Sequence, residues 1–507
     1  MDLIHILASV TFILLLIFIY LSWQYTYFQR RGIPTAKGII PPFGHMLPII
    51  VIHKTLGTLC EKFYNETKGY SMCGFYHLWT PILLIREPEL VKNVLQTNFS
   101  SFSENPFDIS SVKCDQLLKS HPFFTKGDEW KKSRAPVTNS LSAMKLKLMM
   151  PVIQRIVSRM TEYLQYQCGK EVDLKVLCNK FTGEFSAIES GIQTNNFKNT
   201  DEIGYNQMID IFFKTPTFGN GVRLMIFFIL PALGSFLNYG LTPKVVDQYF
   251  REIGTKVVNN RRKEKGNYND YIQYVMDYQK LHHNIENEEV LAAAHMLSFA
   301  FDVYEIVAVT TSFLIMDLAR RPEIQNKVRE EIITILDKYN GELTYDALKE
   351  MPFFDKVLNE SQRMNHLLGI TMKICTKRTK LEGTDGLSCV IEPGQKVAVS
   401  IYGLQMDPKY WNEPEIFDPE RFNNDEKNTR HKFTFLPFGE GPRMCVGMRI
   451  GIILVKLAVA GILKDFSVEP SKKMVFPMTK DETNFLNFPL GGFWVKIRPL
   501  KSGACSE

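Results

Sequence analysis

The residue whose surroundings best suit chemistry is Cys445, which lies in a loop rich in glycine and proline at residues 435–450, FLPFGEGPRMCVGMRI. A helix-forming run begins at Met448, so backbone N–H groups and the positive end of that helix would stabilise a Cys445 thiolate. The loop glycines let the backbone approach something large and flat, and Arg443 adds a fixed cation. A thiolate that binds haem iron needs a tight loop, a low thiol pKa and a counter-charge for the haem propionates.

The remaining cysteines show no second site of this kind. The chain holds nine cysteines, an odd number, and none of them forms a C-x-x-C pair. A zinc site or a thioredoxin-type redox motif is therefore not expected. We interpret all of them except Cys445 as buried free thiols in a reducing compartment.

Two further groups of residues have spacings that bring their side chains to one face of a helix. Trp130 and Arg134 are four residues apart, which suits hydrogen bonds to an anionic group. Glu360 and Arg363 are three residues apart, and Arg421 would complete a buried network of one glutamate and two arginines. By spacing alone these could be an ordinary amphipathic pair and a surface ion pair, and it is the set of motifs described next that makes us expect a ligand contact from the first and a structural network from the second.

With these residues in place, the sequence resembles the cytochrome P450 family. The family's haem-loop pattern, F-x-x-G-x-R-x-C-x-G, is met here by Phe438, Gly441, Arg443, Cys445 and Gly447. Three shorter family motifs follow the expected order along the chain: W-x-x-x-R at residues 130–134, E-x-x-R at 360–363 and P-E-R-F at 419–422. The resemblance covers nearly the whole chain, and it looks most like the microsomal animal branch rich in toxin- and drug-clearing enzymes.

The resemblance implies a haem b cofactor with Cys445 as the iron ligand. The other side chains that it implies around the haem are Arg443, Trp130, Arg134, Lys373 and Phe438. Lys373 takes a position that is commonly arginine in the family, and a lysine holds a propionate only as a point charge. Gln405 replaces the histidine of the family's H-x-D-P segment, and His366 and Leu367 replace its usual Pro-Pro.

The largest departure from the family lies in its long central helix. The family usually carries a small pair, then an acid and a threonine, where this chain reads Asp302-Val303-Tyr304-Glu305-Ile306. We expect Asp302, Glu305 and Ile306 to lie at the catalytic centre. The family's threonine is thought to help deliver protons to dioxygen, and isoleucine cannot donate a hydrogen bond. Either Ile306 only lines the pocket while water or Glu305 supplies the proton, or oxygen activation suffers.

The N-terminus predicts a membrane anchor. Residues 4–23 are almost all apolar, and twenty residues at helical rise span about 30 Å, the thickness of the bilayer core. No basic residue precedes this run and bulky aromatic residues crowd its end, which disfavours a cleaved signal peptide. Arg30 and Arg31 follow it, so the body of the chain should lie in the cytosol. We expect an anchor at residues 1–29 in the endoplasmic reticulum membrane and a basic, proline-rich connector at residues 30–45.

The rest of the chain, residues 46–507, is expected to form one mainly α catalytic domain with a small β portion, similar to the cytochrome P450 fold. Helical periodicity is clear at residues 146–166, 245–262 and 322–336. Strand-like segments are short and lie at residues 76–85, 397–401 and 493–497. No linker rich in proline, glycine or serine divides the chain after residue 35.

Two surface properties bear on partners. A net charge of +6 over 507 residues is too dilute to favour nucleic acid. A second apolar stretch at residues 224–233, LMIFFILPAL, is too short to span a bilayer. It is either a buried helix end or a surface that dips into the membrane beside the anchor.

The leading functional hypothesis is a monooxygenase that oxidises a lipophilic substrate. The chain has no evident flavin or nicotinamide motif, so electrons must come from a partner. By resemblance the donor is an NADPH-dependent flavoprotein reductase, with cytochrome b5 as a further candidate, docking on the cysteine side where Arg443 and Arg449 would add positive charge. The segments expected to line the substrate pocket are residues 107–124, 212–236, 302–306 and 367–372.

Two other functions stay open. A haem-thiolate isomerase or dehydratase would rearrange a lipid peroxide without a reductase, and Ile306 favours it because some relatives of that kind also lack the threonine. A haem-binding protein that only sequesters a ligand would give no product, either with NADPH and a reductase or with a lipid peroxide.

Overall fold

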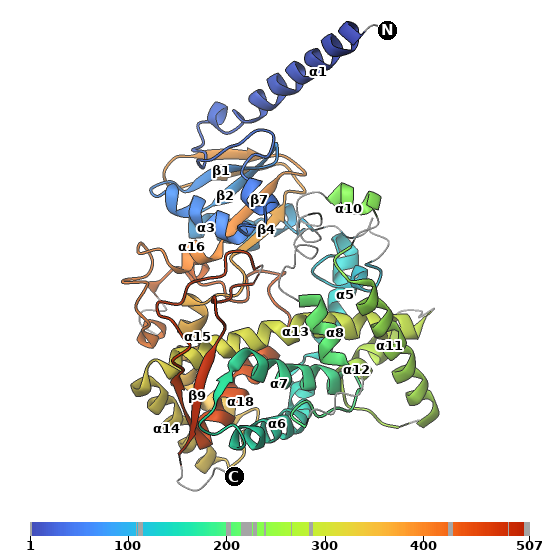
Figure 1. Ribbon diagram of the computed structural model, residues 1–507, viewed down its shortest axis with the longest axis vertical. Coiled ribbons are helices and arrows are strands. Elements are labelled where there is room, and N and C mark those ends of the chain that lie inside the picture. Colours follow the sequence, from blue (N-terminus) through green and yellow to red (C-terminus); the bar gives the residue numbers. More distant parts are fainter. Residues whose placement is uncertain are drawn as a thin grey trace.

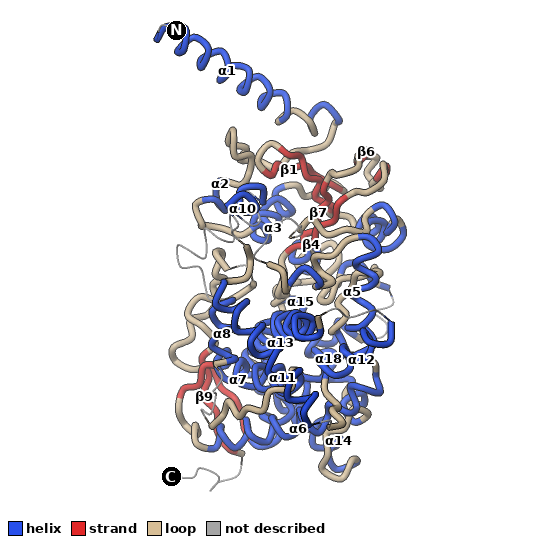
Figure 2. The backbone as a smooth tube through the Cα atoms, turned by 90° about the vertical axis from the view of Figure 1, so that its right-hand side faces the viewer, coloured by secondary structure: helices blue, strands red, loops and turns tan. Residues whose placement is uncertain are grey.

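The long helix α13 is the centre around which the other helices pack (Figures 1 and 2). The computed structural model describes residues 3–107, 109, 115–198, 204–213, 226, 231–237, 240–264, 266–282, 287–423, 429–484 and 486–500. The α-helices are α1 Leu3–Gln24, α2 Leu47–Ile50, α3 Leu56–Glu66, α4 Pro88–Lys92, α5 Gly127–Ser140, α6 Ala143–Gln165, α7 Leu174–Glu189, α8 Tyr205–Phe213, α10 Pro231–Leu237, α11 Lys244–Glu264, α12 Tyr271–His282, α13 Glu288–Ala319, α14 Pro322–Lys338, α15 Pro352–Met364, α16 Ile401–Gln405 and α18 Met448–Asp465. The strands are β1 Met72–His77, β2 Thr80–Ile85, β3 Glu171–Asp173, β4 Ile370–Ile374, β5 Thr379–Glu382, β6 Ser388–Ile391, β7 Lys396–Ser400, β8 Phe466–Pro470 and β9 Trp494–Pro499.

Two helices among the described residues are long and apolar enough to cross a membrane, and the extent of their burial distinguishes them. The segment His5–Arg31 buries 6% of its apolar window inside the protein, whereas α13 buries 78%. A helix that is apolar on all sides and enclosed by protein is a core helix. The helix α1 instead stands clear of the body (Figure 1) and keeps its apolar side chains exposed, as a membrane anchor requires.

The strands form small sheets at the edges of the helical body. The largest has the order β1-β2-β7-β4, a second has the order β3-β9-β8, and β5 pairs with β6. The expectation of one strand over residues 76–85 is wrong, because β1 and β2 are separate antiparallel strands. Leu78 lies between them at φ 55°, a left-handed conformation that turns the chain, and no apolar pattern predicts such a turn.

The predicted helices are present with small shifts at their ends. The three runs that were predicted correspond to α6, α11 and α14, and the run after Cys445 is α18. The molecule is therefore mainly α with small sheets, as expected. The apolar stretch at residues 224–233 lies outside the described residues except for Ile226 and the first residues of α10, so its two interpretations stay open.

The segment after α1 belongs to the body rather than to the anchor. Phe28 is buried against the face of β1, where a Cβ at Gly74 would lie 2.1 Å from the Phe28 ring. The Tyr76 hydroxyl donates a hydrogen bond of 2.9 Å to the carbonyl of Tyr25. Ile33 and Ala36 are buried in the same cluster. The predicted anchor of residues 1–29 therefore includes residues that pack in the core.

Candidate active site

The Cys445 loop is held by its own backbone. The Cys445 N–H donates to the Phe438 carbonyl at 2.9 Å, and the Met444 N–H donates to the Gly441 carbonyl at 3.0 Å. Gly441 has φ +81°, and a Cβ there would lie 1.9 Å from the Leu95 carbonyl oxygen. Only glycine fits this position, because it combines a left-handed backbone with direct contact to another segment.

Cys445 differs from the other cysteines in its surroundings. Among the seven cysteines that the structure describes it alone is exposed. Burial among protein atoms and, to a smaller extent, the Asp302 carboxylate nevertheless raise the pKa of its thiol to about 11. The Gly447 N–H and Arg134 act in the opposite direction. The thiol is thus accessible yet surrounded by protein, and without a metal its pKa is higher than the loop suggested.

The central helix has a narrow accessible stripe. Between Ala292 and Ala319 every residue is buried except Phe301, Asp302, Ile306 and Thr310. The last three repeat at intervals of four and so share one face of the helix. We call Asp302, Ile306 and Thr310 the α13 stripe. The Thr310 hydroxyl is not free on this stripe, because it donates to the Ile306 carbonyl at 2.8 Å.

Asp302 is held by a residue that the sequence did not single out. The His121 Nε2 lies 3.1 Å and 3.2 Å from the two carboxylate oxygens of Asp302. His121 Nδ1 accepts a hydrogen bond of 3.0 Å from the Phe123 N–H. The two partners are 181 residues apart in the chain, so no local spacing could reveal this pair.

Glu305 points away from the α13 stripe. Its side chain is buried and pairs with Lys175 of α7 at 2.8 Å, and the Asn179 amide donates to it at 3.3 Å. Burial raises the pKa of Glu305, and Lys175 lowers it. The carboxylate therefore joins α13 to α7 in this structure.

Three cations gather near the Cys445 loop. Arg443 donates to the carbonyls of Pro122 at 3.1 Å and Thr125 at 2.9 Å, and its guanidinium lies 4.5 Å from the centre of the Trp130 ring. Arg134 donates to the Met444 carbonyl at 2.7 Å. Burial lowers the pKa of Arg443 to about 10. Arg443 is thus half-buried and bonded to backbone carbonyls, and its contribution to a docking surface stays a prediction.

Lys373 on β4 is the third cation. Its ammonium donates to Asn105 Oδ1 at 2.6 Å. Burial, with the charge of Arg443 in addition, lowers its pKa to about 7. Within the described residues the three cations are bonded to amide or carbonyl oxygens rather than to a carboxylate, and the Glu104 charge acts on Arg443 from farther away.

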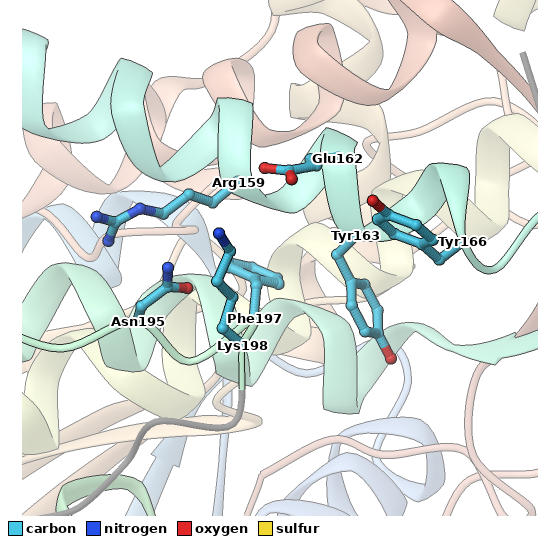
Figure 3. Close-up of a pocket in the computed structure, with 7 residues that line it drawn as sticks. All are labelled: Arg159, Glu162, Tyr163, Tyr166, Asn195, Phe197 and Lys198. Atoms are coloured by element: carbon cyan, nitrogen blue, oxygen red, sulfur yellow. The ribbon is translucent and has the colours of Figure 1, made fainter. Parts of the chain in front are cut away.

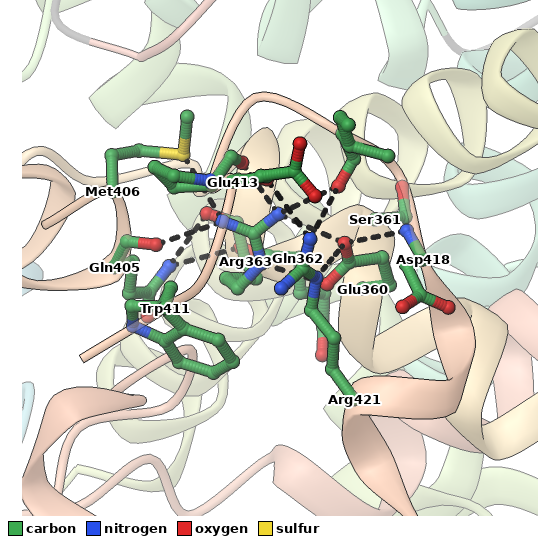
Figure 4. A network of polar contacts seen from close by, with 12 residues as sticks. Glu360, Ser361, Gln362, Arg363, Gln405, Met406, Trp411, Glu413, Asp418 and Arg421 are labelled. Carbon is green, nitrogen blue, oxygen red and sulfur yellow. Dashed lines mark hydrogen bonds and ion pairs between the residues drawn. The ribbon is translucent and has the colours of Figure 1, made fainter. Parts of the chain in front are cut away.

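The predicted glutamate–arginine network is present behind the loop (Figure 4). Arg363 donates to the Glu360 oxygens at 2.7 Å and 2.8 Å, and Arg421 lies 3.4 Å from the same carboxylate. The Gln405 amide donates to the Arg363 carbonyl at 3.0 Å and accepts from the Leu436 N–H at 2.9 Å. Gln405 thus ties α15 to the start of the Cys445 loop.

Two cavities lie outside the α13 stripe. One of about 670 Å³ is bordered by Ser120 and Phe124, by the start of α5, and by the buried His295 of α13. The other, of about 60 Å³, lies beside α6, where Arg159 and Tyr163 face Phe197 (Figure 3). None of the predicted site residues lines this smaller cavity.

Comparison with known proteins agrees with this arrangement. The family model described as Cytochrome P450 matches residues 34–494. The chain is 29% identical to cytochrome P450 6k1 of Blattella germanica over 91% of its own length and 90% of that protein. It is 29% identical to the probable cytochrome P450 6a13 of Drosophila melanogaster, covering 96% and 97%, and to cytochrome P450 6B1 of Papilio polyxenes, covering 97% and 99%. The chain belongs to the cytochrome P450 family.

Proposed function

We propose that this protein is a membrane-anchored haem-thiolate monooxygenase that oxidises a lipophilic small molecule with O₂ and electrons from a reductase. One observation carries most of the proposal. The exposed Cys445 lies close enough to the α13 stripe for the Asp302 charge to act on its thiol, in a chain whose family binds haem. When bound, the haem supplies oxygen activation, and a thiolate ligand favours cleavage of the O–O bond.

Cys445 is the proposed iron ligand. Because burial keeps its thiol protonated at neutral pH, binding to iron would release that proton. The Gly447 N–H and the Arg134 guanidinium both lower the thiol pKa, so they would support negative charge on the sulfur. The closed loop between Phe438 and Cys445 fixes where the sulfur lies.

The three cations fit the two propionates of a haem. Arg134, Arg443 and Lys373 are partly or fully buried and pair only with carbonyl or amide oxygens among the described residues. Carboxylates form shorter and stronger hydrogen bonds with such cations than neutral oxygens do. Trp130 and Phe438 would add apolar contact, since the Trp130 ring lies under Arg443.

The α13 stripe is the proposed wall of the substrate site. Ile306 offers an apolar surface there, and Asp302 offers a carboxylate. Glu305, which the sequence suggested as a proton donor, is better described as a positioning residue because Lys175 and Asn179 hold it.

The proposed partners follow from the sequence, in which no flavin or nicotinamide motif is evident, and from the N-terminal membrane anchor. Electrons would come from an NADPH-dependent flavoprotein reductase, with cytochrome b5 as a second donor. Arg449, exposed at the start of α18, is a candidate contact on the cysteine side. The exposed helix α1 would anchor the protein in the endoplasmic reticulum membrane with its body in the cytosol.

A second candidate is a haem-thiolate isomerase or dehydratase acting on a lipid peroxide. Ile306 favours it, because the stripe has no free hydroxyl: Thr310 is bonded to the backbone. Such an enzyme needs no proton delivery to O₂.

One experiment separates the candidates. The full-length protein in vesicles is supplied with NADPH and a flavoprotein reductase under ¹⁸O₂, or with a fatty-acid hydroperoxide alone. Labelled product that requires NADPH supports the monooxygenase, and hydroperoxide turnover without NADPH supports the isomerase. A normal haem spectrum with no product in either arm contradicts both.

A further inference from the structure

The carboxylate of Asp302 is unexpected at a site for an apolar substrate. It is 48% exposed in the middle of a helix whose neighbouring residues are nearly all buried. It shares the α13 stripe with Ile306, and its charge acts on the Cys445 thiol. If the proposed function is right, this carboxylate borders the substrate.

His121 hydrogen-bonds to Asp302 and orients it. His121 Nδ1 accepts the Phe123 N–H, so that nitrogen carries no proton in this arrangement. The Nε2–H then donates to the Asp302 carboxylate, and both ring nitrogens are satisfied. His121 therefore fixes where the carboxylate lies on the α13 stripe.

The cationic side chains of Lys175, Arg443 and Lys373 are bonded to groups other than Asp302. Lys175 is paired with Glu305 on the α7 side of the helix. Arg443 is turned toward the carbonyls of Pro122 and Thr125, and Lys373 toward Asn105. Within the described residues Asp302 has no ion pair other than His121. A carboxylate without a cationic partner at the wall of the site favours a ligand that supplies one, because charge-assisted hydrogen bonds and ion pairs are the stronger ones.

Aromatic rings surround the pair. The Phe301 ring lies 5.8 Å from the His121 ring and 5.3 Å from Phe212 of α8. The Phe213 ring stacks on Phe301 at 5.6 Å with an interplanar angle of 15°. Phe124 lies 5.7 Å from His121 on the other side. Ring faces attract cations, so rings beside a carboxylate suit an organic ammonium group with apolar substituents.

We propose that the substrate site recognises lipophilic cations, with Asp302 as the residue that binds the positively charged nitrogen and His121 as the residue that positions it. The substrate class is then an apolar molecule that carries a protonated or quaternary amine.

The test is calorimetric titration of the haem-loaded, full-length protein with three probes that share a decyl chain: decyltrimethylammonium, decanol and decanoate. The quaternary nitrogen of decyltrimethylammonium has no lone pair and cannot bind to the haem iron. Its measured affinity therefore reports only on contacts with the protein. We expect the cation to bind about ten- to a hundredfold more tightly than decanol, and decanoate to bind most weakly. Asp302→Asn should remove the preference, and Asp302→Glu should retain part of it.

Glu129→Gln is the matched control, because Glu129 borders the neighbouring cavity of about 670 Å³ but not the α13 stripe. This variant should keep the full preference. Equal affinities in the wild type, a preference that survives Asp302→Asn, or one that Glu129→Gln abolishes would overturn the inference. If Asp302→Asn does not load haem, Asp302→Ser provides a second neutral variant. A wild type that loads no haem would contradict the proposed function itself.

Discussion

At the scale of single residues, Ile306 is where the chain and its family differ most in chemistry. It lies on the α13 stripe, and the nearest hydroxyl on that stripe, of Thr310, is bonded to the Ile306 carbonyl. A missing hydrogen bond to a charged group is worth about 1.5–3 kcal/mol, roughly ten- to a hundredfold in a rate that it controls. Proton delivery is therefore the step expected to suffer.

Ile306→Thr should raise the ratio of product formed to NADPH consumed, and Ile306→Val, which keeps the shape without the hydroxyl, should not. The measurement is product and NADPH consumption in the same reconstituted sample. An unchanged ratio in Ile306→Thr would mean that water already delivers the proton, or that the enzyme is an isomerase.

The lowered pKa of the buried Lys373 leads us to predict that haem binding depends on pH. Burial lowers its pKa to about 7 from an ordinary value of 10.5, so above pH 7 the haem-free protein must take up a proton to form a lysine–propionate pair. The contribution of Lys373 to haem affinity is therefore complete below pH 7. It falls by about tenfold per pH unit above pH 7, until the pKa in the haem complex is reached.

Lys373→Arg stays charged throughout and should lack this dependence. The measurement is haem transfer to an acceptor apoprotein from pH 6 to 9, expressed as the ratio of wild type to variant. Release of the Cys445 proton affects both proteins equally and cancels in the ratio. A ratio that does not change with pH would show that Lys373 does not contact the propionates.

At the scale of elements, α15 and the Cys445 loop depend on one buried network. Glu360 and Arg363 are fully buried, and removing one partner of such a pair costs about 3–5 kcal/mol. Glu360→Ala should therefore give little haem-loaded protein. Glu420→Ala, which removes an exposed partner of Lys356, should cost at most about 1 kcal/mol.

Urea unfolding and the yield of haem-loaded protein measure both variants. Stable, fully loaded Glu360→Ala protein with slower turnover would instead indicate that the network serves catalysis.

The same elements show what the sequence could predict. The positions of Glu360 and Arg363, and the run that became α18, followed from helical spacing, which is a local property. The turn at Leu78 and the pair between His121 and Asp302 did not, because one depends on a single backbone angle and the other joins distant segments. The Lys175–Glu305 pair, which joins α7 to α13, was missed for the same reason.

At the scale of the whole molecule, the structure shows which N-terminal residues can be deleted to remove the anchor without removing residues of the core. The helix α1 ends at Gln24, but Phe28 is buried against Gly74. Deleting residues 3–22 should leave a stable body, whereas deleting residues 1–30 should cost about 3–5 kcal/mol because a buried phenylalanine is lost. Thermal unfolding of the two truncated proteins tests this. Equal midpoints would show that Phe28 adds nothing to the core.

The shorter deletion should still bind membranes weakly. In α10, which lies in the half of the molecule nearest α1 (Figures 1 and 2), Phe236 is 85% exposed and Leu237 is 53% exposed. Exposed apolar residues on one short helix suit a membrane surface. Flotation with phospholipid vesicles should therefore recover part of the truncated protein, and Phe236→Asp with Leu237→Asp should reduce it. Purely soluble behaviour before this change would exclude the contact.

The central claim is that Cys445 is the axial ligand of a haem, and the carbon-monoxide difference spectrum of the reduced protein tests it most directly. Wild-type protein should give the carbon-monoxide band typical of thiolate ligation. Cys445→His should move that band to the position of an imidazole ligand, while Cys389→Ala, which changes a buried thiol elsewhere, should leave it unchanged. A thiolate-type band that persists in Cys445→His would contradict the account.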